Sequence, residues 1–249
     1  MKNKTHRLIL IYFLFLSGIS ILVVASFWWE GLDKELKIET TFSETNILSS
    51  NVYKELIDKI INDSTKKLNL NEITEIIENH PYVKVARVSR HYPSKLIVEI
   101  IERTPIAIVN KNPMIFLDEE SYVLPEMGNL NDYNLPILSN FNTDSGLYPN
   151  GMQALSSKVI ECTSIIKQLK NRYTNLYDNL SELKITSDNE IELILADHPT
   201  HIYLGNKNIY DRIHILKEFE NKLKPNSISN FNYLDFRYEN QIIANNRKS

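Results

Sequence analysis

Residues 80–96 read HPYVKVARVSRHYPSKL, and this stretch decides how the chain around it folds. Pro81 ends the helical pattern that precedes it, because proline cannot continue a helix interior. Residues 83–90 then have the composition of a strand, residues 92–95 read as a tight turn, and residues 96–101 alternate as a returning strand. The stretch therefore predicts a β-hairpin that directly follows a helix.

Upstream of the hairpin, the sequence predicts one more strand and two helices. Residues 36–42 alternate acceptably for a strand, and residues 50–61 have apolar side chains at helical spacing. Asn69, followed three residues later by Glu72, resembles a capping box that opens the second helix. The order β-α-α-β-β fits in about 70 residues, with the helices covering one face of a small sheet. The apolar positions of the helices are Val52, Leu56, Ile60 and Ile61, then Ile73, Ile76 and Ile77.

The N-terminal part contains one long uncharged segment. Residues 8–27 read LILIYFLFLSGISILVVASF, without a charged side chain. A helix of this length spans a hydrocarbon core of about 30 Å, at roughly 1.5 Å rise per residue. Trp28 and Trp29 follow at once, and their amphipathic rings prefer the headgroup level. We therefore expect a transmembrane helix at residues 8–29 that contacts the lipid bilayer.

The charges beside this segment predict its orientation. Lys2, Lys4 and Arg7 lie before it, whereas acidic and basic residues are mixed after it. The positive-inside rule then places residues 1–7 in the cytoplasm and the bulk of the chain outside it. A cleaved signal peptide is the alternative interpretation. Its apolar core would be shorter, about 7–15 residues, and residues 23–25 (VVA) are a weak cleavage signal.

Composition argues against several classes of site. Three of the 28 basic residues precede the apolar segment, so the part after it has 25 basic against 31 acidic residues. A surface with that balance does not attract a nucleic-acid backbone. The single cysteine, Cys162, cannot close an intrachain disulfide, and its position on an apolar helical stripe predicts a small core residue. The six glycines form no phosphate-binding loop.

The adjacent residues Glu102 and Arg103 are the first candidates for chemistry. Side chains of neighbouring strand residues point to opposite faces, so these two cannot share a catalytic site. We expect a structural role for both. Arg103 would anchor a domain junction, and Glu102 would pair with Arg87 or Arg90.

Two histidines are the candidates for a metal site. His198 and His201 are three residues apart, but Pro199 breaks any helix that would align their rings. No carboxylate or cysteine partner has a recognisable spacing, so we interpret both as surface loop residues. The sequence thus predicts no enzyme activity, no metal or other cofactor, and no small-molecule substrate.

Beyond Pro105 the pattern becomes rich in strands, with two helices between them. Residues 155–173 carry an apolar stripe, and residues 209–223 mark a second helix that Pro225 ends. Residues 126–149 are mostly polar, interrupted by residues 135–138 (LPIL), and predict loops. The chain therefore predicts a mixed, β-rich second domain with flanking helices. Its expected strands are residues 106–109, 114–117, 122–124, 180–185, 191–195, 201–204, 232–238 and 241–244.

These stretches resemble the FtsQ/DivIB family of bacterial cell division proteins over nearly the whole chain. Residues 80–96 are similar to the family pattern P-x-V-x-x-A-x-V-x-R-x-x-P-x-x-L, and residues 102–107 (ERTPIA) to its ER-x-P-x-A element. Ser121 and Gln241 depart from the pattern, because the family usually has glycine at both positions. Shorter matches follow in order at residues 116–118, 135–136, 203–205 with Arg212 and Leu216, and 234–238.

The resemblance implies an α+β fold with a single N-terminal transmembrane helix. A POTRA-type β-α-α-β-β domain and a mixed β-rich domain with flanking helices would follow it. The expected divisions are a cytoplasmic tail at 1–7, a transmembrane helix at 8–29, a POTRA-like domain at 33–105, a β-domain at 106–244 and a disordered tail at 245–249.

The resemblance also implies a function. The chain would be a scaffold of the bacterial division septum, anchored in the inner membrane and binding other division proteins outside the cytoplasm. In this family the C-terminal strands receive the partners FtsB and FtsL by strand addition. The implied protein-binding residues are Tyr238, Gln241, Ile242, Ile243 and Ala244. From the residues alone, an ordinary edge strand protected by charged neighbours is an equal interpretation.

Two other classes of function stay open at this point. The first is another POTRA-bearing membrane protein that chaperones polypeptides in transport, which would more often show repeated POTRA units. The second is an anchored envelope enzyme, which would need a catalytic constellation that the sequence does not offer.

Overall fold

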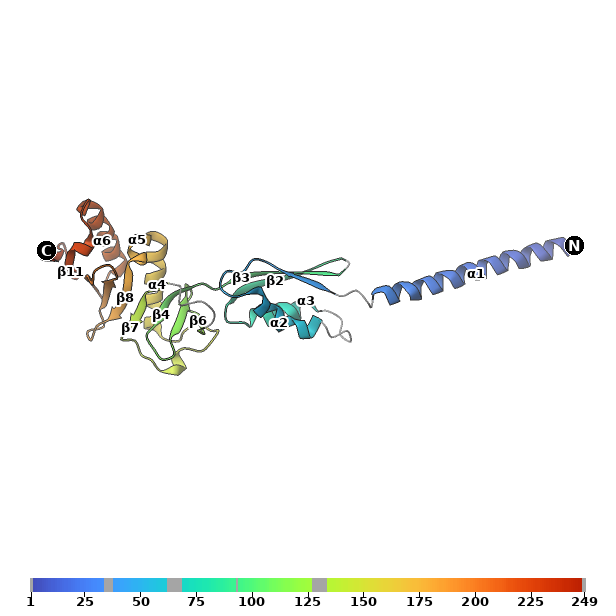
Figure 1. Ribbon diagram of the computed structural model, residues 1–249, viewed down its shortest axis with the longest axis horizontal. Coiled ribbons are helices and arrows are strands. Elements are labelled where there is room, and N and C mark those ends of the chain that lie inside the picture. Colours follow the sequence, from blue (N-terminus) through green and yellow to red (C-terminus); the bar gives the residue numbers. More distant parts are fainter. Residues whose placement is uncertain (1, 34–37, 62–68, 93, 127–133, 248–249) are drawn as a thin grey trace.

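The computed structural model describes residues 2–33, 38–61, 69–92, 94–126 and 134–247. Figure 1 shows three parts along the long axis: helix α1, a small sheet with helices α2 and α3, and a larger sheet with helices at the C-terminal end. This mixed architecture of an apolar helix and two sheets with helices confirms the predicted α+β fold class.

Helix α1 covers Lys2–Asp33 as one continuous element. Its segment Ile11–Trp28 is long and apolar enough to cross a membrane, and its side chains pack against no other part of the described chain. A helix that is apolar on all sides is stable where lipid rather than water surrounds it. The described residues contain one such helix, which is consistent with a single-pass membrane anchor.

The small sheet has the order β1-β3-β2 in the described part of the chain. β1 pairs with β3 in parallel, and β2 pairs with β3 as an antiparallel hairpin. The helices cover one face of this sheet, where Tyr53, Ile57 and Ile73 pack against Leu96 and Val98. The elements are β1 Glu39–Phe42, α2 Ser50–Ile61, α3 Leu70–Glu78, β2 Val83–His91 and β3 Lys95–Glu102.

The predicted β-α-α-β-β order is therefore confirmed. α2 has the predicted bounds, and the Asn69 side chain caps α3 by accepting the backbone N–H of Asn71 at 3.1 Å. The first strand was expected to begin at residue 36, but residues 34–37 lie outside the described part of the chain.

The larger sheet has the order β12-β11-β10-β9-β8-β7-β4-β5-β6 among the described residues. Helices α4 and α6 pack on β4 and β10, and the core between helices and sheet includes Val159, Leu183, Ile202 and Leu216. The strands are β4 Pro105–Val109, β5 Ile115–Asp118, β6 Val123–Leu124, β7 Ile137–Ser139, β8 Leu180–Ile185, β9 Ile191–Leu195, β10 His201–Gly205, β11 Phe231–Asp235 and β12 Ile243–Asn246. The helices are α4 Ser157–Arg172, α5 Thr174–Asp178 and α6 Ile209–Leu223.

Three details of this part of the chain differ from expectation. β7 lies inside the stretch that predicted loops, at the end of its apolar interruption. A run of three residues becomes a strand here because it pairs in parallel with both β4 and β8. Leu155 precedes α4 and is 65% exposed, so it does not belong to the apolar stripe of that helix. Asn245 and Asn246, expected in a disordered tail at 245–249, pair with Tyr233 and Phe231 in the sheet.

The two sheets share packing at their junction. Phe116 and Leu124 come from the larger sheet but are buried among the core side chains of the small one. Arg103 anchors this junction through Asp118, as predicted. The expected partner of Glu102 was wrong, because its carboxylate binds the chain ahead of α2, and Arg87 pairs with Glu99 instead.

Candidate functional site

The candidate site is the outer edge of the larger sheet at the C-terminal end of the chain. β12 pairs antiparallel with β11 on one side, and no other strand of the described chain pairs with its outer side. All of its residues are exposed. An exposed edge strand presents unpaired backbone N–H and C=O groups, which can pair with a strand of another chain.

The hydrogen bond of Arg247 indicates which backbone groups face outward. Its N–H donates to the carbonyl of Asn230 at 2.9 Å, so this residue points toward the sheet. Along an antiparallel strand, inward and outward backbone groups alternate with every residue. Ile243, opposite Asp235, then faces β11, and the N–H and C=O groups of Ala244 face outward. The carbonyl of Asn246 instead accepts the side-chain N–H of Asn232 from β11 at 3.4 Å.

The five residues implied by the resemblance lie in three consecutive segments. Ile243 and Ala244 are in β12, and Gln241 and Ile242 come immediately before it. Ile242 is partly buried against the main core, so its side chain helps to hold the edge strand in place. Tyr238 is in the turn between β11 and β12 and is 48% exposed.

The turn before β12 does not need the glycine that the family pattern has at position 241. The left-handed backbone conformation is at Asn240, with φ of 59°, and asparagine tolerates that conformation. Ser121 does take a left-handed conformation, with φ of 64°, where the family usually has glycine. Its N–H donates to the carbonyl of Asp118 at 3.0 Å within the β5–β6 turn.

Arg237 holds the end of β11 with charged hydrogen bonds. Its Nε donates to Asp235 Oδ1 at 2.9 Å, its Nη2 to Oδ2 at 2.7 Å, and its Nη1 to Glu190 at 2.9 Å. The hydrogen bonds with Asp235 and then Glu190 raise the pKa of Arg237 above its ordinary value. Burial raises the pKa of Asp235, but the hydrogen bonds from Arg237 outweigh it and lower the pKa overall. The chain therefore enters the turn in a defined direction.

Arg212 of α6 ties this turn to β10. Its guanidinium donates to the carbonyl of Leu204 and, at 3.0 Å, to the carbonyl of Arg237. Gly205 has φ of 74°, and a Cβ there would lie 2.5 Å from Nη1 of Arg212. Glycine at this position lets the arginine reach both β10 and the turn after β11.

Aromatic side chains lie beside the edge on the sheet face away from the helices. The rings of His201 and Tyr203 are 6.3 Å apart, and those of Tyr203 and Tyr233 are 6.2 Å apart. His201 begins β10, and its Nδ1 lies 2.5 Å from a carboxylate oxygen of the buried Glu192. The interpretation of His201 as a loop residue was therefore wrong, whereas His198 is exposed outside the strands.

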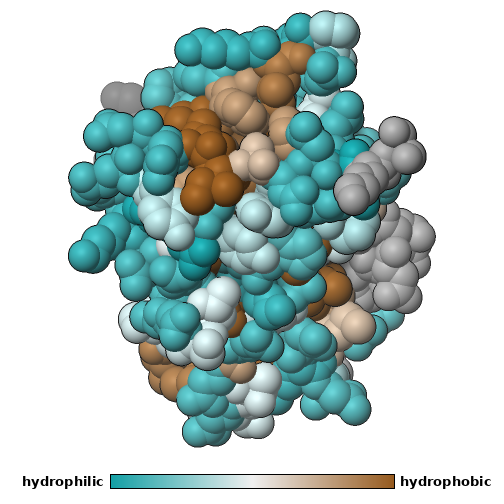
Figure 2. All heavy atoms as spheres, turned by 90° about the vertical axis from the view of Figure 1, so that its left-hand side faces the viewer, coloured by the Kyte–Doolittle hydropathy of each residue, from teal (hydrophilic) through white to brown (hydrophobic). Residues whose placement is uncertain are grey.

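Figure 2 shows the C-terminal end of the molecule, with apolar surface set among hydrophilic side chains. The exposed apolar side chains of this end include Ile215 on α6 and Ile243 on β12. Elsewhere, Cys162 is buried in α4, and this burial raises the pKa of its thiol to about 12. Within the described ranges, no group of three His, Cys, Asp or Glu side chains could hold a metal ion.

Sequence reasoning missed the residues that support the edge. Glu190 and Arg212 are 47 and 25 residues before Arg237, yet both contact it. Glu192 looked like an ordinary strand residue, but it is buried as the partner of His201. If β9 and β10 are paired, Glu192 and His201 become diagonal neighbours on one face of the sheet, and this could have suggested their contact.

Two family models match this chain, one after the other. Residues 43–103 match "POTRA domain, FtsQ-type", and residues 104–245 match "FtsQ/DivIB, C-terminal related". Both matches agree with the two sheets of the structure.

Individual relatives point in the same direction. The chain is 24% identical to "Cell division protein FtsQ" of Syntrophotalea carbinolica, over 72% of this chain and 62% of that protein. It is 26% identical to the protein of the same name from Koribacter versatilis, over 71% and 50%. It is 25% identical to "Cell division protein DivIB" of Clostridium tetani, over 57% and 49%.

The chain thus spans between about half and two thirds of the length of these relatives. The family match to residues 104–245 alone covers more than half of the chain, and the POTRA match adjoins it. On these grounds the chain belongs to the FtsQ/DivIB family.

Proposed function

We propose that this chain is a non-enzymatic scaffold of the bacterial division septum. α1 anchors it in the cytoplasmic membrane, with residues 1–7 in the cytoplasm and the remainder outside. The family membership and the cell division names of its relatives support this function. The exposed apolar helix and the basic residues before it support the anchor and its orientation.

The proposed activity is binding of other division proteins at the β12 edge. The partners are division membrane proteins resembling FtsB and FtsL, and one of them adds a strand to β12. The outward backbone groups of Ala244 supply hydrogen bonds, while Tyr238 and Ile243 supply apolar contact. The single observation that supports this most is that β12 is a fully exposed edge strand held in a defined place.

The outer part is further proposed to divide into a POTRA-like domain at 33–105 and a β-domain at 106–244. The family description of the first part as FtsQ-type supports division rather than polypeptide transport as its context. No substrate or cofactor is required for a function that rests on binding geometry.

The experiment is a pair of substitutions at Ala244, tested by co-purification with the FtsB-like and FtsL-like proteins of the same organism. Ala244→Pro removes an outward N–H, and proline is tolerated on edge strands. Ala244→Ser keeps the N–H and serves as the matched control. We expect loss of the partners for the proline variant, normal capture for the serine variant, and similar melting temperatures for both.

Normal capture by the proline variant would place the partner elsewhere on the chain. A strong fall in melting temperature would instead mean that this segment supports the fold more than an edge should. Ile243→Pro distinguishes these cases, since it removes an inward N–H and should lower the melting temperature more than Ala244→Pro.

A further inference from the structure

At the junction between the two domains, the side chains of the adjacent residues Glu102 and Arg103 point in opposite directions. Only residues 103–104 separate β3 from β4. The carboxylate of Glu102 accepts the backbone N–H groups of residues 46–48 at 2.6, 2.8 and 3.0 Å. It also accepts the hydroxyl of Tyr53 at 2.7 Å, so Glu102 binds entirely within the POTRA domain. The next side chain, Arg103, enters the C-terminal domain.

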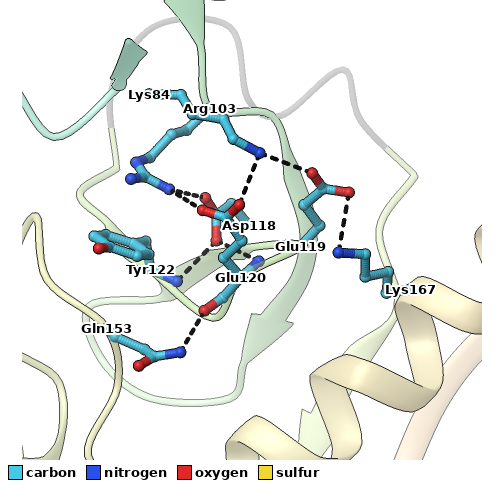
Figure 3. Close-up of polar contacts among 8 residues, drawn as sticks. All are labelled: Lys84, Arg103, Asp118, Glu119, Glu120, Tyr122, Gln153 and Lys167. Atoms are coloured by element: carbon cyan, nitrogen blue, oxygen red, sulfur yellow. Dashed lines mark hydrogen bonds and ion pairs between the residues drawn. The ribbon is translucent and has the colours of Figure 1, made fainter.

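Arg103 is held by the turn between β5 and β6. Its Nη1 lies 2.6 Å from Asp118 and 3.1 Å from Glu120, and its guanidinium lies 3.5 Å from the centre of the Tyr122 ring. Asp118 is fixed in turn by the backbone N–H groups of Glu120 and Tyr122, both at 2.8 Å. Figure 3 shows these groups converging on the arginine. Because the guanidinium is planar and stacks on the Tyr122 ring, these contacts fix the orientation of Arg103 relative to the turn.

Lys84 of β2 makes a second crossing from the POTRA domain. Its Nζ lies 3.0 Å from Glu119 and 2.9 Å from Glu120 on the same turn. Glu119 also lies 3.6 Å from Lys167 of α4, so the ion pairs extend from β2 to a helix of the C-terminal domain (Figure 3). Both β2 and the segment directly after β3 are thus tied to one turn.

Apolar contacts add a third crossing. Phe116 and Leu124 fill the POTRA core, and the Tyr82 hydroxyl donates to the carbonyl of Pro125 at 2.6 Å. Gly151 lies against Pro81, where an added Cβ would be 3.4 Å from the proline ring. These contacts hold the domains together, but apolar packing has little directional preference.

We infer that Arg103 and its partners Asp118, Glu120 and Tyr122, together with the Lys84 ion pairs, lock the two domains in one orientation. Relative motion is the default for two domains joined by a short segment, unless their interface is extensive. Here directional bonds cross the domain junction from β2 and from the segment after β3, so the orientation is a built-in property of the chain. If the proposed function holds, this lock also fixes the direction of the β12 edge relative to the POTRA domain.

The test measures the distance between the domains in the full chain. Spin labels are attached at Tyr92→Cys, in the exposed β2–β3 turn, and at Lys207→Cys, in the exposed segment after β10. The native Cys162 is fully buried and stays unlabelled. Electron double resonance then gives the distance distribution in detergent or lipid discs, without any partner.

Two variants weaken the lock, and one is a matched control. Arg103→Lys keeps the charge but loses the planar fork and the stacking on Tyr122. Lys84→Met removes the second crossing. Arg87→Met removes a cation from the same strand whose ion pair, among the described residues, is with Glu99 inside the POTRA domain. A circular dichroism melt checks folding, and Lys84→Met decides the test if Arg103→Lys does not fold.

We expect one narrow distance distribution in the unchanged chain and in Arg87→Met, and a broader or split distribution in the variants that weaken the lock. A broad distribution in the unchanged chain would overturn the inference, and so would widths that neither Arg103→Lys nor Lys84→Met alters. The measurement involves no partner, so its failure is separate from a failure of the binding proposal.

Discussion

The two edge strands of the larger sheet, β6 and β12, differ in how the described part of the chain covers them. At the β6 edge, Val123 donates its N–H to the carbonyl of Met152 and accepts the N–H of Gly151, both at 2.9 Å. Leu124 beside it is buried in the POTRA core. At the β12 edge, all residues are exposed and no described segment covers the outer side. One edge is closed by the chain itself, and the other is left open.

The difference indicates where the chain can accept a partner. An open sheet edge can pair with strands of other chains and cause aggregation, so natural sheets usually cover or shorten their edge strands. This chain covers the β6 edge with both a loop and a second domain, yet it positions the β12 edge with Arg237, Arg212 and Glu190. A positioned but uncovered edge is what strand addition requires.

The largest expected effect comes from separating the POTRA domain from the C-terminal domain that carries the closed β6 edge. Residues 33–105 alone should fold with mixed α and β content but melt below residues 33–249. The reason is that Phe116 and Leu124 no longer fill the POTRA core, and each buried side chain of this kind stabilises by about 1.5–3 kcal/mol. Circular dichroism melts of both fragments provide the measurement. An unfolded short fragment beside a cooperative long one would mean that the two parts share one core.

A single substitution at each edge sharpens the comparison. Leu124→Ala should lower the free energy of unfolding by about 2–5 kcal/mol, because it leaves a cavity at a fully buried position. Ile243→Ala on the open edge should change it by about 0.5 kcal/mol or less. Urea titration of both variants measures the difference. Equal losses would show that the β12 edge is not an independent, lightly packed strand.

Partner binding is expected to depend on the β12 edge, whereas stability depends on the β6 edge. Tyr238→Ala is expected to weaken partner binding by about 2 kcal/mol or more, because the proposed contact uses this ring as an anchor. The free energy of unfolding of this variant should hardly change, because the Tyr238 side chain is half exposed in a turn. Titration of the purified partner against the variant gives the affinity. Val85→Ala, at an exposed position of the POTRA sheet, is the control and should bind normally.

The smallest effect is a pH dependence near the closed edge. His80 Nδ1 accepts the N–H of Tyr82, whose hydroxyl bonds to Pro125 just after β6. Burial lowers the pKa of His80 below its ordinary value of 6.5, although Glu102 acts in the opposite direction. The unfolded chain therefore binds a proton first as the pH falls, so the folded state loses stability below about pH 6.5.

The matched variant for this effect is His80→Gln. Its melting temperature should fall less than that of the unchanged chain between pH 7.5 and pH 5.5. An identical fall in both proteins would assign the pH dependence to other groups.

Local pattern was sufficient wherever a segment has a regular apolar period. The helix at Ser50–Ile61 and the strands Leu180–Ile185 and Ile191–Leu195 have the predicted bounds. The opposite directions of Glu102 and Arg103 also followed from the two-residue period of a strand. The family resemblance rested on motifs of the same local kind, and the matching family models confirm it.

Tertiary structure decided the features that depend on distant residues. The carboxylate of Glu102 meets a segment more than fifty positions earlier, and His201 meets Glu192 only because β9 and β10 pair. Asn245 and Asn246 have no apolar pattern, yet the backbone of β11 orders them. Backbone hydrogen bonding is independent of side-chain type, so no sequence pattern marks such a strand or states which edge stays open. The sequence by itself determined the family and the elements that have a regular apolar period, and the packing of distant strands decided β7, the domain junction and the open edge.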